Sequence, residues 1–193
     1  NPHYEVPDTR LEARVRAEHA FTSWLRAGAA ARTAQVRFGS DSLAVNGPGG
    51  AIAQTTDRHD AFGGDVTFDT RLDPAFPRNA VYASLGLERL AFSDAAQQRV
   101  AARRGTADLR GYVGLGPTIV GVRGLVMTSD VPLPPSEQAL LGGTDTLRGY
   151  EAGHAANDNL AAISTEVRVP INSPLSVGRF GVKGFVDWGT TWS

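Results

Sequence analysis

The residues best suited to chemistry in this sequence are one arginine on a glycine-rich segment and two acidic residues that follow it. Arg148 lies within Leu140–Tyr150 (LLGGTDTLRGY), while Glu166 and Asp187 each lie in a later stretch of alternating apolar and polar residues. A guanidinium and a carboxylate form charge-assisted hydrogen bonds, often two at once. Both acids fall on the face that carries the other charges, so the pattern predicts a loop arginine pinned to carboxylates on two strands.

Other chemistries fit the sequence less well. Gly142 and Gly143 could cradle a phosphate, but they lack both the G-x-G-x-x-G spacing and a following helix. Asp65, Asp69 and Glu88 could supply an acid pair for hydrolysis, but their alternation favours a polar lining in which arginines neutralise them. The arginines expected beside these acids are Arg71, Arg110 and Arg123.

Composition excludes several classes of site and partner. The 193 residues include 19 basic and 20 acidic side chains, and this net charge of −1 gives no electrostatic reason to expect nucleic acid as a partner. The absence of cysteine removes disulfide scaffolds and thiolate metal sites. The four histidines lie too far apart in sequence to suggest a metal site, so neither a metal nor another cofactor is expected.

No stretch approaches the roughly 18 apolar residues that a transmembrane helix needs. The first residues, NPHYEVPD, lack the basic and apolar regions of a signal peptide. These observations exclude a helical membrane protein, but they leave a membrane β-barrel open because its strands alternate in polarity.

Period-two alternation, the signature of a strand, recurs along the chain. The predicted strands are residues 11–19, 25–38, 64–71, 81–90, 106–115, 119–127, 163–169 and 182–188. Residues 39–59, 94–105 and 129–159 are predicted as long loops, and short turns join the other strands. One face of each strand is apolar and the other is rich in charge, which favours an antiparallel transmembrane β-barrel. A soluble β-sandwich, whose strands also alternate, is the alternative.

Three motifs resemble the C-terminal barrel of the BamA/TamA outer-membrane assembly family, also called bacterial surface antigens. They are GGTDTLRGY (142–150), NDNLAAISTEVRVPI (157–171) and GFVDWGTTW (184–192). The residues around Arg148 that carry the first motif are Gly142, Gly143, Leu147, Gly149 and Tyr150. A fourth segment, FDTRLDPAFPRNAVY (68–82), resembles the periplasmic turn of the family, with Asn79 where the family usually has glycine. The residues that match this turn are Asp69, Arg71, Pro74, Phe76 and Pro77.

The resemblance implies a sixteen-stranded barrel preceded by periplasmic POTRA domains. Residues 1–193 would form about eight of these strands, without the POTRA domains, the first strands or the last two strands. Long loops would face the cell exterior and short turns the periplasm, and the loop at 129–159 would fold into the barrel lumen. By the same resemblance, Arg148 is the loop arginine, and Glu166 and Asp187 are its acidic partners on the barrel wall.

The function that the resemblance implies is assembly or insertion of outer-membrane proteins, without enzymatic activity, in the bacterial outer membrane. The expected partners are the lipid bilayer, unfolded outer-membrane or secreted client proteins, periplasmic chaperones and accessory lipoproteins. Two relatives of this function stay open: a polypeptide pore for two-partner secretion, and the barrel of a surface antigen fused to an enzyme. A simple porin and a soluble β-sandwich module are the more distant alternatives.

Overall fold

The chain folds into one antiparallel sheet of eight long strands. The computed structural model describes residues 9–38, 55–93, 98–171 and 180–193. The strands of the large sheet, in their spatial order, are β1 (Thr9–Ala20), β2 (Leu25–Phe38), β3 (Thr55–Asp69), β4 (Ala80–Ser93), β5 (Arg99–Leu115), β6 (Thr118–Ser129), β9 (Asn159–Ile171) and β10 (Phe180–Trp192). The predicted all-β, antiparallel architecture is confirmed.

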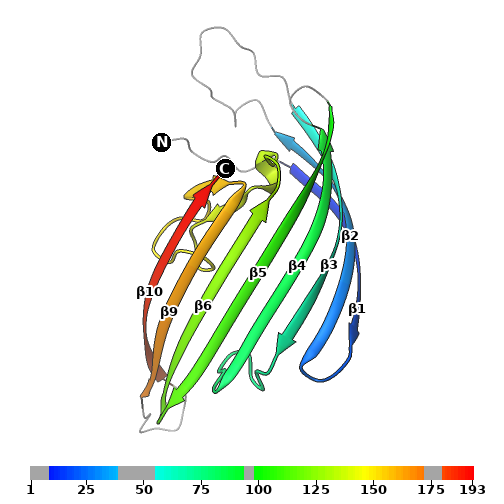
Figure 1. The fold of residues 1–193 in the computed structure, drawn as a ribbon. Coiled ribbons are helices and arrows are strands. Elements are labelled where there is room, and N and C mark those ends of the chain that lie inside the picture. The colour runs from blue at the N-terminus through cyan, green and yellow to red at the C-terminus, as the bar shows by residue number, and fades with distance from the viewer. Residues whose placement is uncertain (1–8, 39–54, 94–97, 172–179) are drawn as a thin grey trace.

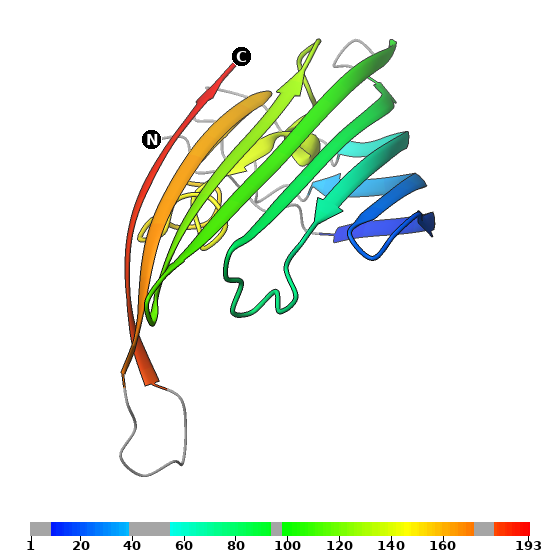
Figure 2. The same ribbon diagram turned by 60° about the horizontal axis from the view of Figure 1, so that its bottom comes forward.

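The sheet is a curved shell, with β1 and β10 at its two ends (Figures 1 and 2). Each strand pairs with the next in space, and the shell is not closed, because the described residues show no pairing of β1 with β10. The turns after β1, β3 and β5 lie at one end of the shell, and the segment between β6 and β9 fills part of its hollow (Figure 2).

The two faces of the sheet differ in polarity in the way the alternation predicts. Large apolar side chains stand exposed on the outer face, including Val15 at 76%, Leu87 at 75% and Val186 at 74%. The inner face carries arginines, aspartates and glutamates that pair with one another. A water-soluble monomer rarely exposes so continuous an apolar surface, whereas a barrel in a bilayer presents such a band to lipid.

Most strands are longer than predicted, and β3 and β5 extend furthest into predicted loops. β3 begins at Thr55 and β5 at Arg99, although the sequence predicted loops over 39–59 and 94–105. The first part of β3, from Thr55 to Asp60, contains only polar residues, so it shows no period-two hydrophobic pattern. Its backbone nevertheless pairs with β2 up to the end of that strand, where Phe38 lies opposite Thr55. The remaining parts of these predicted loops, residues 39–54 and 94–97, lie outside the described residues.

The connection from β6 to β9 has its own structure, which the sequence did not predict. It contains a short 3-10 helix, η1 (Pro135–Glu137), and a two-stranded ladder of β7 (Ala139–Leu141) and β8 (Ala155–Asn157). We call residues 130–158 the inner loop. At its base, Asp158 accepts a hydrogen bond of 2.8 Å from the backbone of Leu133.

Two apolar patches on the inner face of the sheet support this loop. Leu133 packs on a cluster from β3, β4 and β5, which comprises Ala61, Leu90, Phe92 and Ala102. Ala139 and Leu141 pack on Leu160 and Ala162 of β9. The burial of these side chains removes apolar area from water, so the loop is held against both halves of the shell.

Among the described residues, no helix is long and apolar enough to cross a membrane.

Candidate functional site

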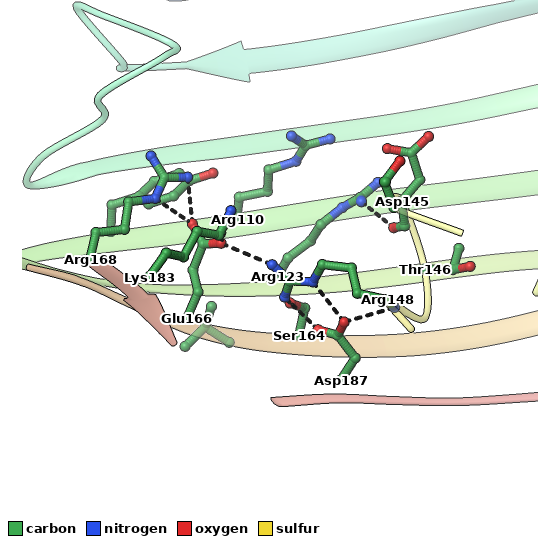
Figure 3. A pocket seen from close by; sticks show the side chains of 14 residues that line it. Arg110, Arg123, Asp145, Thr146, Arg148, Ser164, Glu166, Arg168, Lys183 and Asp187 are labelled. Atoms are coloured by element: carbon green, nitrogen blue, oxygen red, sulfur yellow. Dashed lines mark hydrogen bonds and ion pairs between the residues drawn. The ribbon is translucent and has the colours of Figure 1, made fainter. Parts of the chain in front are cut away.

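Arg148 lies at the centre of a polar site on β9 and β10 (Figure 3). Its guanidinium donates to both carboxylate oxygens of Asp187, at 2.5 and 2.7 Å, and its backbone N–H donates to Asp187 Oδ2 at 3.0 Å. It also donates to Ser164 Oγ at 2.5 Å and to Glu166 Oε2 at 3.3 Å. The Phe185 ring lies beneath it, with the guanidinium carbon 3.8 Å from the ring centroid. We call Arg148 and these four partners the arginine anchor.

Glycines with positive φ shape the loop tip that presents Arg148. Gly142 has φ of 119°, and a Cβ built there would lie only 2.0 Å from the Glu151 carbonyl oxygen. Gly149, directly after the arginine, has φ of 93°. L-residues with a side chain rarely adopt such angles. The Thr146 hydroxyl closes the tip, since it accepts from Gly142 N–H and donates to Gly142 C=O, both at 2.8 Å.

The two acidic partners of Arg148 are not equivalent. The Asp187 side chain is only 4% exposed, and Arg148 is the one cation that pairs with it in the described part of the chain. Glu166 is shared, because Lys183 lies 2.9 Å from Oε2 and Arg168 donates to Oε1 at 2.7 Å. The hydrogen bond with Asp187 raises the pKa of the Arg148 guanidinium above its usual value. Asp187 is therefore the principal partner and Glu166 an auxiliary one.

A second tie joins this loop tip to β6. Arg123 donates to the Asp145 carbonyl oxygen at 2.5 Å and to Asp108 at 2.9 and 3.1 Å. Arg110 donates to the same Asp108 at 2.6 Å. The carboxylates of Asp108, Glu166 and Asp187 are each engaged by arginine or lysine, an arrangement suited to holding a loop rather than to transferring protons.

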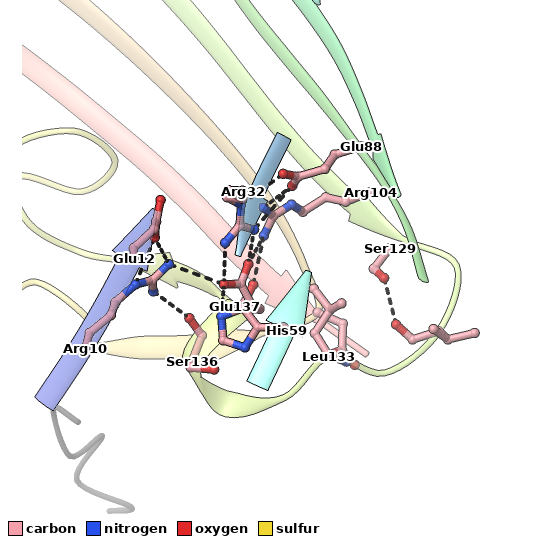
Figure 4. Close-up of polar contacts among 12 residues, drawn as sticks. Arg10, Glu12, Arg32, His59, Glu88, Arg104, Ser129, Leu133, Ser136 and Glu137 are labelled. Atoms are coloured by element: carbon pink, nitrogen blue, oxygen red, sulfur yellow. Dashed lines mark hydrogen bonds and ion pairs between the residues drawn. The ribbon is translucent and has the colours of Figure 1, made fainter. Parts of the chain in front are cut away.

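A second ionic cluster in the hollow, which the sequence did not predict, is centred on Glu137 of η1 (Figure 4). Glu137 is 3% exposed at its side chain and accepts from Arg32 of β2 at 2.5 and 2.8 Å. Arg104 of β5 donates at 3.2 Å, His59 Nε2 of β3 lies 2.9 Å from Oε1, and Arg10 of β1 donates at 3.4 Å. We call Glu137 and these four residues the glutamate anchor.

Burial and charge act on Glu137 in opposite directions. Burial alone would raise the pKa of its carboxyl, but the hydrogen bonds from Arg32 and the charges of Arg32 and Arg104 lower that pKa well below its usual range. Glu137 is therefore ionised throughout the neutral pH range.

Signals for some of the missed residues were present in the sequence. Ser164 lies two residues before Glu166 and Phe185 two before Asp187, so the alternation already placed each on the same face as its neighbour. The glutamate anchor had no comparable signal. Its members are 22 to 127 positions apart in sequence from one another, and His59 fell at the end of a predicted loop.

The predicted turn motif forms a compact unit after β3. Arg71 donates to both oxygens of Asp69, at 2.8 and 2.9 Å, and its guanidinium carbon lies 4.3 Å from the Tyr82 ring centroid. Pro77 is fully buried, whereas Pro74 and Phe76 are exposed. None of these residues is a hydrogen-bond or ion-pair partner of Arg148, but Arg168, which pairs with Glu166, also donates to the Ala75 carbonyl oxygen of the turn at 3.0 Å.

Asn79 ends this turn in a backbone conformation that favours glycine. Its φ is 49°, and its side-chain oxygen accepts a hydrogen bond of 2.9 Å from Gly114 N–H. Asparagine tolerates the left-handed region better than most residues with a side chain. The departure from glycine thus keeps the turn geometry and adds a tie to β5.

The predicted partners of the other inner-face acids were partly wrong. Asp69 pairs with Arg71 as expected, but Asp65 pairs with Arg16 at 2.6 Å. Glu88 pairs with Arg32 at 3.0 Å and with Arg104, and Arg110 and Arg123 instead share Asp108. The physical reason is register, because strand alternation specifies a face but not which residues stand opposite on neighbouring strands.

Comparison with known proteins identifies one family. A family model described as the Omp85 superfamily domain matches residues 4–193, nearly the whole chain. No curated protein gives a significant match.

Proposed function

The chain belongs to the Omp85 superfamily, a family of outer-membrane β-barrels that insert or secrete proteins, and from this premise we propose that it is part of a BamA/TamA-type assembly factor. In this proposal the protein inserts client β-barrels into a bacterial outer membrane and catalyses no covalent chemistry. The unfinished shell is then about half of a larger barrel that carries POTRA domains.

The observation that carries the proposal is the inner loop tied across the concave face. It contacts β1, β2, β3 and β5 through Glu137 and β9 and β10 through Arg148. A polypeptide that passed through the lumen would have to displace this loop and leave buried charges unpaired. A client that inserts along the barrel wall would leave the loop in place, so the geometry favours insertion over secretion.

The outer face of the sheet indicates one partner of the protein. The apolar outer face suits the lipid bilayer. We propose three further kinds of partner, because an assembly factor needs them. They are unfolded client proteins, periplasmic chaperones and accessory lipoproteins.

A reconstitution experiment tests this function. The full-length protein in liposomes is given, in parallel, a urea-unfolded outer-membrane β-barrel and an unfolded soluble secretion substrate. We expect the first to acquire a heat-modifiable, protease-resistant fold several times faster than in empty liposomes, and the second to stay outside. Transport of the soluble substrate into the liposomes, without faster barrel insertion, would favour the secretion pore.

A further inference from the structure

The inner face of β1, β2, β3 and β5 holds four nitrogen-bearing side chains that converge on one carboxylate. Arg10, Arg32, His59 and Arg104 come from four different strands, and each has a nitrogen within 3.4 Å of a Glu137 carboxylate oxygen (Figure 4). Since the strands belong to the sheet and Glu137 to the loop, the wall supplies the cations and the loop supplies the anion.

Part of the wall side of this cluster is buried, whereas the Arg10 side chain is 38% exposed. The side chain of His59 is 1% exposed and that of Arg32 is 9% exposed. Arg32 and Arg104 are oriented by a second acid, Glu88 of β4, which both of them contact. Arg10 is oriented in the same way by Glu12 at 2.6 Å. A site whose donors are held by their own neighbours is organised before its ligand arrives.

Among the arginines and carboxylates that form ion pairs within this cluster, the charges balance only when Glu137 is present. The arginines Arg10, Arg32 and Arg104 face the carboxylates Glu12, Glu88 and Glu137, three charges of each sign. Removal of Glu137 leaves one positive charge in excess, at a place where burial makes an uncompensated charge costly. An open cavity of about 400 Å³ adjoins the cluster, lined in part by Arg14, Arg16 and Arg104, so a small anion can reach it.

We propose that Arg10, Arg32, His59 and Arg104 form a carboxylate-binding site in the hollow of the sheet, that Glu137 occupies it as an internal ligand, and that a free carboxylate takes it when Glu137 is removed. The site is distinct from the arginine anchor, which lies on β9 and β10. It does not depend on the assembly function proposed above. Any acidic side chain that reaches the hollow competes with Glu137 for it.

The test compares wild type with Glu137→Ala in the full-length protein, with acetate as the probe. The matched control is Glu151→Ala, because Glu151 is an exposed acid of the same loop. Thermal unfolding is followed in sodium acetate, in sodium chloride of equal ionic strength and in acetamide, the neutral analogue. We expect acetate to raise the Tm of Glu137→Ala above its value in chloride or acetamide, since a ligand that binds only the folded state stabilises it. Wild type and Glu151→Ala should show no such difference.

Hydrogen exchange gives a second readout. In Glu137→Ala we expect amide protection over residues 131–141 to fall at least about tenfold, while residues 142–150 keep theirs through Arg148. An acetate effect of equal size in wild type and Glu137→Ala, or none in either, would overturn the binding site. If Glu137→Ala does not fold, Glu137→Gln keeps the side-chain volume, and unchanged protection over 131–141 in that variant would overturn the role of the carboxylate.

Discussion

The arginine anchor and the glutamate anchor hold the two halves of one loop with opposite polarity. At Arg148 the loop supplies the cation and the wall supplies the acids. At Glu137 the loop supplies the acid and the wall supplies the cations. Residues 130–158 carry five acidic side chains and one basic side chain, so the loop is acidic overall, and each anchor pairs with the wall segment whose charge complements it.

The two anchors differ in how much support remains when the loop residue is lost. Without Arg148, Asp187 keeps no cationic partner in the described part of the chain. Without Glu137, Arg32 and Arg104 still contact Glu88. The arginine anchor therefore depends on one critical pair, Arg148 and Asp187, whereas the glutamate anchor is a network with partial compensation.

The largest expected effect is that of Arg148→Ala. It leaves the buried Asp187 carboxylate unpaired, and loss of one partner of a buried pair costs about 3–5 kcal/mol. We expect a lower thermal midpoint of the barrel in gel heat-modifiability, weaker assembly of client proteins and unchanged synthesis. Arg148→Lys should recover only part of the loss, because lysine lacks the planar fork that engages both Asp187 oxygens. Wild-type behaviour of Arg148→Ala would argue against a pinned loop.

The second-largest expected effect is a difference between Asp187 and Glu166 in how strongly each is coupled to Arg148. In double-mutant cycles with Arg148→Ala, we expect Asp187→Asn to couple by about 1.5–3 kcal/mol, the range for hydrogen bonds to charged groups. Glu166→Gln should couple by less than about 1 kcal/mol, because Lys183 and Arg168 share that carboxylate.

Tryptic cleavage offers an independent measurement of the same difference. Arg148 is the only lysine or arginine between residues 130 and 158, so cleavage after it reports release of the loop tip. The rate should rise more in Asp187→Asn than in Glu166→Gln. The reverse order would make Glu166 the principal partner.

The charged residues of the arginine anchor could be predicted from the sequence, whereas the glutamate anchor could not. Arg148, Glu166 and Asp187 could be grouped from the sequence, because a motif marks the loop tip and strict alternation places both acids on one face. Glu137 follows a proline-rich stretch without a motif, and its partners come from four strands. Such a cluster depends on strand register and curvature, which period-two patterns do not encode.

The strands of the fold could also be predicted only where alternation of apolar and polar residues marks them. Strands with an apolar face toward the outside, such as β4 and β6, were recognised from their alternation. The first residues of β3 and β5 were not. Residues 55–60 of β3 are all polar, and residues 99–105 of β5 include three arginines and a glycine, although Ala102 packs in the cluster with Leu90 and Phe92. The structure of the inner loop was also missed, since β7 and β8 are only three residues long and depend on packing against Leu160 and Ala162.

A smaller effect concerns the pH dependence of the glutamate anchor. Because the pKa of Glu137 is lower in the folded state than its ordinary value of 4.5, its contribution to stability is complete above that value and is lost as the pH falls through the folded pKa. Arg10, Arg32 and Arg104 stay charged over this range. The stability difference between wild type and Glu137→Gln, measured by denaturant unfolding, should therefore be constant above about pH 5 and shrink below pH 4. A difference that grew on acidification would contradict this sign.

The smallest expected quantity is the coupling between the two anchors. Arg148 and Glu137 have no partner in common among the described residues, and they contact opposite halves of the shell. Mutations at distant sites without shared partners add to within about 0.3–0.5 kcal/mol. The unfolding free energy lost in the Arg148→Ala/Glu137→Gln double variant should equal the sum of the single losses within that margin. A larger coupling would mean that the loop leaves the hollow as one unit, because the β7–β8 ladder between the anchors would then transmit release of one end to the other.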